Sequence, residues 1–163
     1  MNIEILTADY ADKRHRQDIP FLLDAYARDP MGGGAPLDPQ VKTRLVGELA
    51  RLPHAFSVIA YVDGAPAGLV NCFEGFSTFL GRPLVNIHDV VVLAQFRGRG
   101  IARRMLDRVE EIARARGCCK LTLEVLSNNE AAKSAYRKFG FSDYRLDPEA
   151  GTALFWQKKL GVA

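Results

Sequence analysis

The stretch from Val90 to Ala102 has residue types and spacing that suit an anion site. An apolar run ends in the loop Arg97-Gly98-Arg99-Gly100, which leads directly into a helical pattern. Glycines carry no side chain, so backbone N–H groups can converge there on an oxyanion, and the unpaired amides at the start of a helix add the positive end of its dipole. A pyrophosphate group would fit this loop. Taken alone, the same pattern is also typical of a tight turn with solvated arginines.

Two common phosphate-binding motifs are excluded. The dinucleotide-binding fingerprint needs a third glycine three residues after Gly100, where Arg103 stands. The phosphate-loop motif of nucleotide hydrolases needs Gly-Lys followed by Ser or Thr, which is absent. The ligand must therefore be inferred from other residues.

Composition places the chain among ordinary globular proteins. Its 163 residues are 48% hydrophobic and 25% charged, which predicts one domain spanning residues 1–163. The formal charge is +3, and basic residues gather between Arg97 and Lys120, as suits a phosphorylated small ligand. An extended nucleic-acid surface would show a longer basic stripe or interleaved aromatics, so we expect no nucleic-acid partner.

Cysteines and histidines give no sign of a metal site. The chain holds three of each: Cys72, Cys118, Cys119, His15, His54 and His88. The cysteines lack metal-type spacing and lie in apolar surroundings, so we expect reduced, buried thiols and no metal. There is no apolar signal core and no run of membrane-spanning length. These features predict a cytoplasmic protein without membrane contact.

Periodicity and capping signals predict an order of strands and helices. The predicted elements are a strand at 3–7, a helix begun by Asp18 and Pro20 and running to 27, a helix begun by Asp38-Pro39 and ending before Pro53, strands at 56–62 and 67–76 joined by a hairpin at Asp63-Gly64, a strand at 84–93, a helix from about 100 to Gly117, a strand at 121–125, a helix at 129–139 ended by Gly140, and a closing hairpin of 141–144 with 153–157. This order favours a single mixed α/β domain.

Two motifs within this order resemble those of the GNAT superfamily of N-acetyltransferases. The first, Gln-x-x-Gly-x-Gly, comprises Gln95, Gly98 and Gly100; the second is Asn129-Glu130-Ala131-Ala132 with Tyr136, Lys138 and Gly140-Phe141. The resemblance covers an acetyl-CoA core at about residues 56–142. It implies an α/β (α+β) single-domain fold whose central mixed, mostly antiparallel sheet is splayed at the cofactor site and flanked by about four helices.

The resemblance implies acetyl-CoA as cosubstrate. Amides from Arg97 to Ala102 would hold its pyrophosphate, and backbone groups of Val91 and Leu93 would pair with the pantetheine arm like an added strand. Arg97, Arg99, Arg103 or Arg104 could neutralise the adenosine phosphate, or equally stay solvated. Asn129 would cap its helix or bind pantetheine. The implied cofactor-binding residues are Val91, Val92, Leu93, Gln95, Arg97, Gly98, Arg99, Gly100, Ile101, Ala102, Arg103, Asn129, Ala132, Tyr136 and Lys138.

Three residues are candidates for catalysis. Tyr136 shares a helical face with Ala132 and Phe139, which by spacing alone indicates a core tyrosine; the resemblance implies a general acid for the CoA thiolate. Holding a lysine-like amine unprotonated at pH 7 costs roughly 4 to 5 kcal/mol, so a base is expected. His88 and Asp89 are the candidates, and alternation along a strand predicts that only one of them faces the cleft. The resemblance also implies the Val91 N–H as oxyanion donor.

The acceptor is less defined. Residues 73–89 are similar to the diamine acetyltransferase branch, with His88 in place of its glutamate. Carboxylates at Asp24, Asp29, Glu74 and Asp89 could attract a cationic amine, or could be surface charges. The predicted activity is acetyl transfer to a primary amine of a small molecule by a ternary complex. The alternatives are a protein or peptide N-acetyltransferase and a non-catalytic acyl-CoA-binding regulatory module. The resemblance also implies that a homodimer could form through the last strands, with apolar area from Phe155 and Trp156, although the two residues could equally be core.

Overall fold

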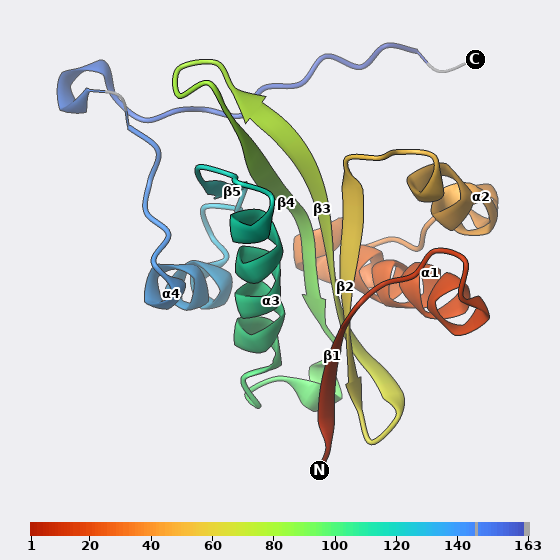
Figure 1. Ribbon diagram of the computed structural model, residues 1–163. Helices are drawn as coiled ribbons and strands as arrows, with labels where there is room; N and C mark the ends of the chain where they lie inside the picture. Colours follow the sequence, from red (N-terminus) through yellow and green to blue (C-terminus); the bar gives the residue numbers. More distant parts are fainter. Residues whose placement is uncertain (146, 162–163) are drawn as a thin grey trace. The chain divides into compact units, whose positions relative to one another are not determined.

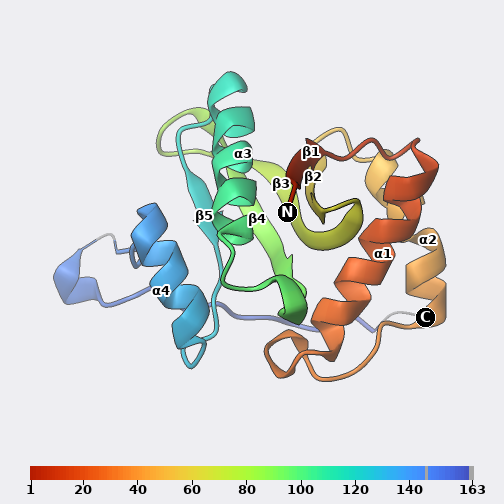
Figure 2. The same ribbon diagram turned by 90° about the horizontal axis from the view of Figure 1, so that it is seen from below.

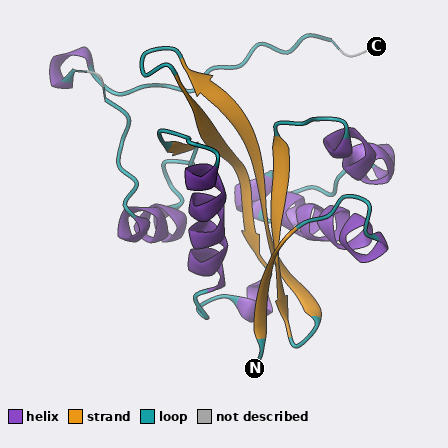
Figure 3. Cartoon of the chain, viewed as in Figure 1, coloured by secondary structure: helices purple, strands orange, loops and turns teal. Residues whose placement is uncertain are grey.

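The computed structural model describes residues 1–145 and 147–161. The chain divides into two compact units, Met1–Leu123 and Glu124–Ala163, which are described separately. The single domain over residues 1–163 stays a prediction. In the first unit, a five-stranded mixed sheet has the order β1-β2-β3-β4-β5 (Figure 3). Its strands follow one another in space as they do in the sequence.

Helices and strands closely follow the predicted order. They are β1 (Ile3–Thr7), α1 (Lys13–Arg28), the short 3-10 helix η1 (Pro30–Gly32), α2 (Pro39–Ala50), β2 (Ala55–Val62), β3 (Ala65–Ser77), β4 (Arg82–Val92), η2 (Ala94–Phe96), α3 (Ile101–Ala115), β5 (Leu121–Leu123), α4 (Glu130–Phe139) and η3 (Pro148–Ala150). The mixed α/β fold class is therefore confirmed.

The sheet opens along one edge of β4. Strands β1 to β4 are antiparallel, whereas β5 runs parallel to β4 and pairs only with Val85–Ile87. Beyond Ile87, β4 continues to Val92 with no strand on that side among the described residues. This confirms the predicted splay, since the second half of β4 has one unpaired edge.

Helices cover both faces of this sheet. Figures 1 and 2 show α1 and α2 on one face and α3 on the other. The core on the first face comprises Ile19, Leu22, Val46, Ile59, Tyr61, Leu69, Val91 and Leu93. On the second face, Met105 is fully buried, and a Cβ at Gly68 would come within 2.9 Å of both its Cε and the Val91 carbonyl oxygen. The absence of a side chain at Gly68 thus lets α3 approach the sheet closely.

Helix α1 begins earlier than predicted. Its cap is Asp12, whose carboxylate accepts hydrogen bonds from the amides of Arg14 (2.8 Å) and His15 (3.0 Å). Asp18 lies inside the helix and accepts a hydrogen bond from the Tyr61 hydroxyl at 2.7 Å. Pro20 also lies inside, where it gives up one helical hydrogen bond. Burial of apolar residues around this position offsets that loss, so the proline does not mark the start of the helix.

The second unit contains one α-helix. Asn129 caps α4 by accepting a hydrogen bond from the Ala132 amide at 3.2 Å, and Gly140 ends it with φ of +112°, so both predicted boundaries are confirmed. The closing hairpin is wrong: neither 141–144 nor 153–157 forms a strand. The 3-10 turn η3, capped by Asp147, stands between them instead of a tight turn that would fix their register. The homodimer expected through these segments stays a prediction.

Three further findings concern cysteines, metals and membranes. Each cysteine is a free thiol; Cys72 is buried as predicted, but Cys118 and Cys119 are only half-buried, so the prediction of burial is wrong for these two. Among the described residues, no three histidine, cysteine or acidic side chains are grouped so that they could hold a metal ion. No helix in the described ranges is long and apolar enough to span a membrane.

Candidate functional site

A β-bulge at His88 shapes the candidate site. In the pairing of β3 with β4, Asn71 lies opposite Asp89 and Cys72 lies opposite Ile87, so His88 has no partner residue. One extra residue in a strand interrupts the alternation of its side chains and backbone groups. Every position on β4 after His88 is therefore displaced by one from a regular strand.

The bulge brings both His88 and Asp89 to one face of the sheet. The His88 ring makes an edge contact with Phe73 at 5.5 Å, and the Asp89 carboxylate accepts a hydrogen bond from Asn71 Nδ2 at 2.9 Å. Phe73 and Asn71 are two residues apart on β3, so they point to the same face. The prediction that only one of the pair faces the cleft is wrong, because it assumed a regular strand.

Backbone groups along β4 are displaced in the same way. Before the bulge, the Val85 amide donates to the Lys120 carbonyl, on the β5 side, at 3.1 Å. After it, the Leu93 amide donates to Ala67, on the β3 side, at 2.9 Å. Alternate residues share an edge, so Val91 also faces β3, while Val90 and Val92 face the open edge.

The open edge therefore differs from the expected one. The prediction that Val91 and Leu93 offer backbone groups to a pantetheine arm is wrong, and so is the assignment of the Val91 N–H to an oxyanion at that edge. The backbone groups of Val90 and Val92 face that edge instead. The Val92 carbonyl already accepts a hydrogen bond from Arg97 Nε at 3.0 Å, which ties the following loop to this edge.

The loop before α3 has the geometry of an anion site. Gly98 and Gly100 have φ of +75° and +74°, a left-handed conformation in which a residue with a Cβ is strained. No side chain caps the start of α3, whose first hydrogen bond joins the Arg104 amide to the Gly100 carbonyl at 3.1 Å. The first amides of the helix are thus not covered by a capping side chain, as a pyrophosphate site requires.

Two of the four candidate arginines have acidic partners. Arg97 Nη2 lies 3.0 Å from Asp29, which joins the loop before α3 to the end of α1. Arg103 lies 3.0 Å from Asp107 one turn along α3. The Met31 amide and Arg97 both donate to Asp29, and these hydrogen bonds hold the pKa of its carboxyl below the usual range.

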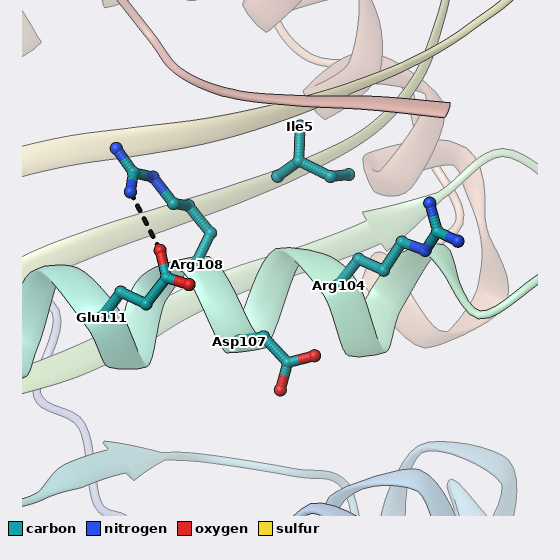
Figure 4. Close-up of a pocket in the computed structure, with 5 residues that line it drawn as sticks. All are labelled: Ile5, Arg104, Asp107, Arg108 and Glu111. Carbon is teal, nitrogen blue, oxygen red and sulfur yellow. Dashed lines mark hydrogen bonds and ion pairs between the residues drawn. The ribbon is translucent and has the colours of Figure 1, made fainter. Parts of the chain in front are cut away.

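Arg99 and Arg104 have no carboxylate partner among the described residues. Arg99 lies 3.2 Å from the sulfur of Met1 and stands 5.8 Å from the ring centre of Phe96. Arg104 lines a shallow hollow of about 360 Å³ between α3 and Ile5 of β1 (Figure 4). That hollow is lined mostly by charged side chains, of which Arg108 and Glu111 pair with each other at 2.9 Å. Both free arginines remain candidates for a phosphate contact.

The four candidate carboxylates differ in whether they have a cationic partner. Asp24 lies 2.9 Å from Arg28 and 3.4 Å from Lys42, and the Arg28 hydrogen bond in particular lowers the pKa of its carboxyl. Glu74 pairs with Arg116 at 3.1 Å, and Asp29 pairs with Arg97 as described. In the part of the chain that the structure describes, Asp89 has no cationic partner, only the neutral amide of Asn71. Of the four carboxylates, it alone is free to attract a cation.

The second unit carries the remaining predicted residues. Ala132, Tyr136 and Phe139 are all half-buried and lie on one face of α4, as the spacing predicts. The Tyr136 ring meets Phe141 edge-on at 5.9 Å. Lys138 is exposed, and Gln95, in the first unit, is exposed within η2. The roles assigned to these residues stay predictions.

Three residues next to Asp89 were missed. Tyr10, Ser57 and Asn71 are joined by hydrogen bonds to one another and, through Asn71, to Asp89. The available signal was a serine and an asparagine in the middle of two otherwise apolar strands. Polar residues at core positions are uncommon and have hydrogen-bond partners when they occur.

Comparison with known proteins identifies the family. The family model described as "Acetyltransferase (GNAT) family" matches residues 19–141, more than half of the chain. The chain belongs to the GNAT acetyltransferase family. This confirms the resemblance drawn from the two glycine- and asparagine-containing motifs. The family is described as one of acetyltransferases.

Curated relatives of this GNAT protein are similar over part of their length. The thialysine N-epsilon-acetyltransferase of Mus musculus is 37% identical over 68 residues, which cover 42% of this chain and 39% of the mouse protein. The streptothricin acetyltransferase of Streptomyces lavendulae is 40% identical over 85 residues, covering 52% of this chain and 43% of that protein. The match thus spans less than half the length of either relative.

Solved structures share the GNAT fold along nearly the whole chain. An integron cassette protein of Vibrio cholerae superposes with a TM-score of 0.78 at 19% identity, covering 98% of this chain and 93% of that one. The structure of AAC(6')-Iy with a bisubstrate analogue, CoA-S-monomethyl-acetylneamine, gives a TM-score of 0.74 at 20% identity, covering 98% and 100%. At such identities the likeness shows the fold alone.

Proposed function

We propose that this protein transfers the acetyl group of acetyl-CoA to a primary amine of a small molecule, by direct transfer in a ternary complex. The observation that carries the proposal is the bulge at His88. It places an imidazole and a carboxylate without a cationic partner among the described residues on one face, beside the open edge of β4. The names of the relatives, which describe amine acetyltransferases, agree with this reaction class.

Residues of the first unit fit a CoA molecule. The glycine loop and the uncapped start of α3 suit the pyrophosphate, and the unpaired edge formed by Val90 and Val92 suits the amide groups of a pantetheine arm. Of the four candidate arginines, Arg99 and Arg104 have no carboxylate partner among the described residues, and they would neutralise the adenosine phosphate. When bound, acetyl-CoA supplies the acetyl thioester.

The acceptor would enter as a cation and must lose a proton. A lysine-like amine is almost wholly protonated at pH 7, so a carboxylate is needed to attract it and a base to deprotonate it. Asp89 has no cationic partner and would bind the ammonium group. The exposed His88 imidazole lies on the same face, so it would take the proton and pass it to solvent.

The acetyl group is then transferred from the thioester to the amine. The amine lone pair attacks the thioester carbonyl carbon, an N–H at the open edge of β4 donates to the carbonyl oxygen, the nitrogen gives up its extra proton to solvent through His88, and the carbon–sulfur bond breaks. Tyr136 would give its proton to the departing CoA thiolate and recover one from solvent. The products are an acetamide and CoA.

Acetyl-CoA turnover against several acceptor classes tests this proposal. CoA-thiol release would be measured with polyamines, amino acids, aminoglycosides and lysine-bearing peptides, using the wild type, His88→Ala and Asp89→Asn. We expect turnover with free amines, a higher KM for the amine in Asp89→Asn, and a lower kcat with an altered pH profile in His88→Ala. Turnover confined to peptides would favour a protein acetyltransferase. Tight acetyl-CoA binding without any turnover would favour a regulatory module.

A further inference from the structure

A chain of hydrogen-bonded side chains runs across the sheet to Asp89. Tyr10, in the loop before α1, lies 2.9 Å from Ser57 on β2; Ser57 lies 2.7 Å from Asn71 on β3; and Asn71 lies 2.9 Å from Asp89 on β4. Ser57 is opposite Asn71, and Asn71 is opposite Asp89, so their side chains share one face. Strands β2, β3 and β4 lie side by side in Figure 1.

The Asp89 carboxylate fixes the direction of every hydrogen bond along this row of side chains. An ionised carboxylate only accepts, so Asn71 must present its Nδ2 to Asp89 and its Oδ1 to Ser57. Ser57 has one hydroxyl hydrogen and gives it to Asn71 Oδ1, so the Tyr10 hydroxyl must donate to Ser57. All three donors therefore point toward the carboxylate.

We propose that Tyr10, Ser57 and Asn71 are positioning residues that hold the Asp89 carboxylate in place for the amine acceptor. This inference rests on the proposed function. Asn71 binds Oδ2 of Asp89, which leaves the other carboxylate oxygen to the acceptor. A side-chain amide does not readily pass a proton along, so the chain orients the carboxylate and does not conduct protons away from it.

Burial supports a role other than stability. Ser57 is fully buried and Asn71 is 4% exposed, and neither has a polar atom without a partner. Two apolar residues of the same shape would serve the core about as well, because a buried hydrogen bond adds little net stability. The presence of Ser57 and Asn71 in the core is therefore explained by the Asp89 carboxylate on β4, which they hold in place.

The surroundings of Asp89 leave its charge available. Burial raises the pKa of the Tyr26 hydroxyl and of the Cys72 thiol, and the nearby Asp89 charge raises both further. Both groups are therefore neutral where the enzyme would work, and His88 is exposed to solvent on the same face. With the neutral Asn71 as its donor, Asp89 is oriented without being neutralised.

Three variants along the chain and one outside it test the proposal. Tyr10→Phe, Ser57→Ala and Asn71→Leu each remove one link, with the loss increasing toward Asp89. Tyr61→Phe is the matched control, because it removes a tyrosine–aspartate hydrogen bond (2.7 Å, to Asp18) on the same face outside this chain. A cooperative thermal unfolding transition would be required of each variant, as a control that it folds.

The kinetic readout separates the KM of the amine from that of acetyl-CoA. We expect the amine KM to rise about two- to fivefold in Tyr10→Phe and about 10- to 100-fold in Asn71→Leu, as for loss of a hydrogen bond to a charged group. The KM for acetyl-CoA should stay unchanged in these variants. In Tyr61→Phe, the KM values for the amine and for acetyl-CoA should both match the wild type. Equal changes in both KM values, or the same change in the control, would overturn the proposal.

A second readout needs no acceptor. The side-chain NH₂ signal of Asn71 would be followed by ¹⁵N NMR in Asp89→Ala, Tyr10→Phe and Tyr61→Phe. We expect it to move in the first two and stay in the third. If the Asn71 signal does not move in Asp89→Ala, the hydrogen-bonded chain from Tyr10 to Asp89 does not exist, even where acetylation is observed. If it moves as expected but the wild type acetylates no amine, the proposed function fails and the hydrogen-bonded chain stands.

Discussion

Replacing Gly100 by alanine should raise the Kd for CoA, because Gly100 has a backbone conformation that alanine adopts only with strain. Gly100 has φ of +74°, and a Cβ built there meets no atom within 4 Å. The cost is therefore conformational and not steric, about 1–2 kcal/mol for an L-residue held in the left-handed region. Relaxation to a negative φ would relieve that cost, but it would turn the first amides of α3 away from the anion.

Gly117 provides a matched control at the other end of the same helix. Its φ is +71°, and a Cβ there also meets nothing within 4 Å. Gly117→Ala should therefore cost the same about 1–2 kcal/mol in unfolding free energy. For a chain of this size that is a fall in Tm of about 2–8 °C. The two variants differ only in which helix end they disturb.

Calorimetric titration with CoA then separates binding from stability. Loss of one hydrogen bond to a charged group costs about 1.5–3 kcal/mol, so the Kd of Gly100→Ala should rise about 10- to 150-fold. The Kd of Gly117→Ala should match the wild type. Equal Kd values in all three proteins, with both Tm values lowered, would refute the assignment of the pyrophosphate to this loop.

Three further predictions concern stability. Met105 is fully buried between α3 and the sheet, so Met105→Ala should lower the unfolding free energy in urea by about 2–5 kcal/mol. Asp12→Ala should lower it by less than Met105→Ala does, because it removes only the exposed cap of α1. The hydrogen bond from Arg28 lowers the pKa of Asp24, so its contribution to stability is complete above the unfolded value near 3.9 and is lost as the pH falls through the lower folded value. Unfolding curves between about pH 5 and 2 should therefore show a smaller acid loss in Asp24→Asn than in the wild type.

Local signals explain why much of the fold could be predicted. The hairpin at Asp63-Gly64 and the ends of α3 and α4 all depend on residues that adopt positive φ, namely Asp63 with Gly64, Gly117 and Gly140. Only a few residue types tolerate that conformation, so their positions mark turns and helix ends directly. The turn at Gly98 and Gly100 before α3 could be predicted for the same reason.

Competing local signals explain the errors. Asp12 comes directly before α1 and Asp18 lies within it. The proline at position 20 made Asp18 look like the cap, whereas Asp12 makes the capping hydrogen bonds. The sequence does not show that burial of Ile19 and Leu22 holds the helix together across the proline. The closing hairpin failed because strand alternation says which faces match but not whether a turn will bring two segments together.

The bulge at His88 is the feature that most affects the site and the one with the weakest sequence signal. Ile87, His88, Asp89 and Val90 look like an ordinary alternating strand, and a bulge becomes visible only when the partner strand is counted against it. Because an added residue shifts all later positions, this one insertion both brings the imidazole and the carboxylate together and moves Val90 and Val92 to the open edge. Residue types could therefore be predicted from the sequence, but the edge to which each backbone group points could not. The buried Ser57 and Asn71 point to the same place independently, since their hydrogen bonds end at Asp89, directly after the bulge.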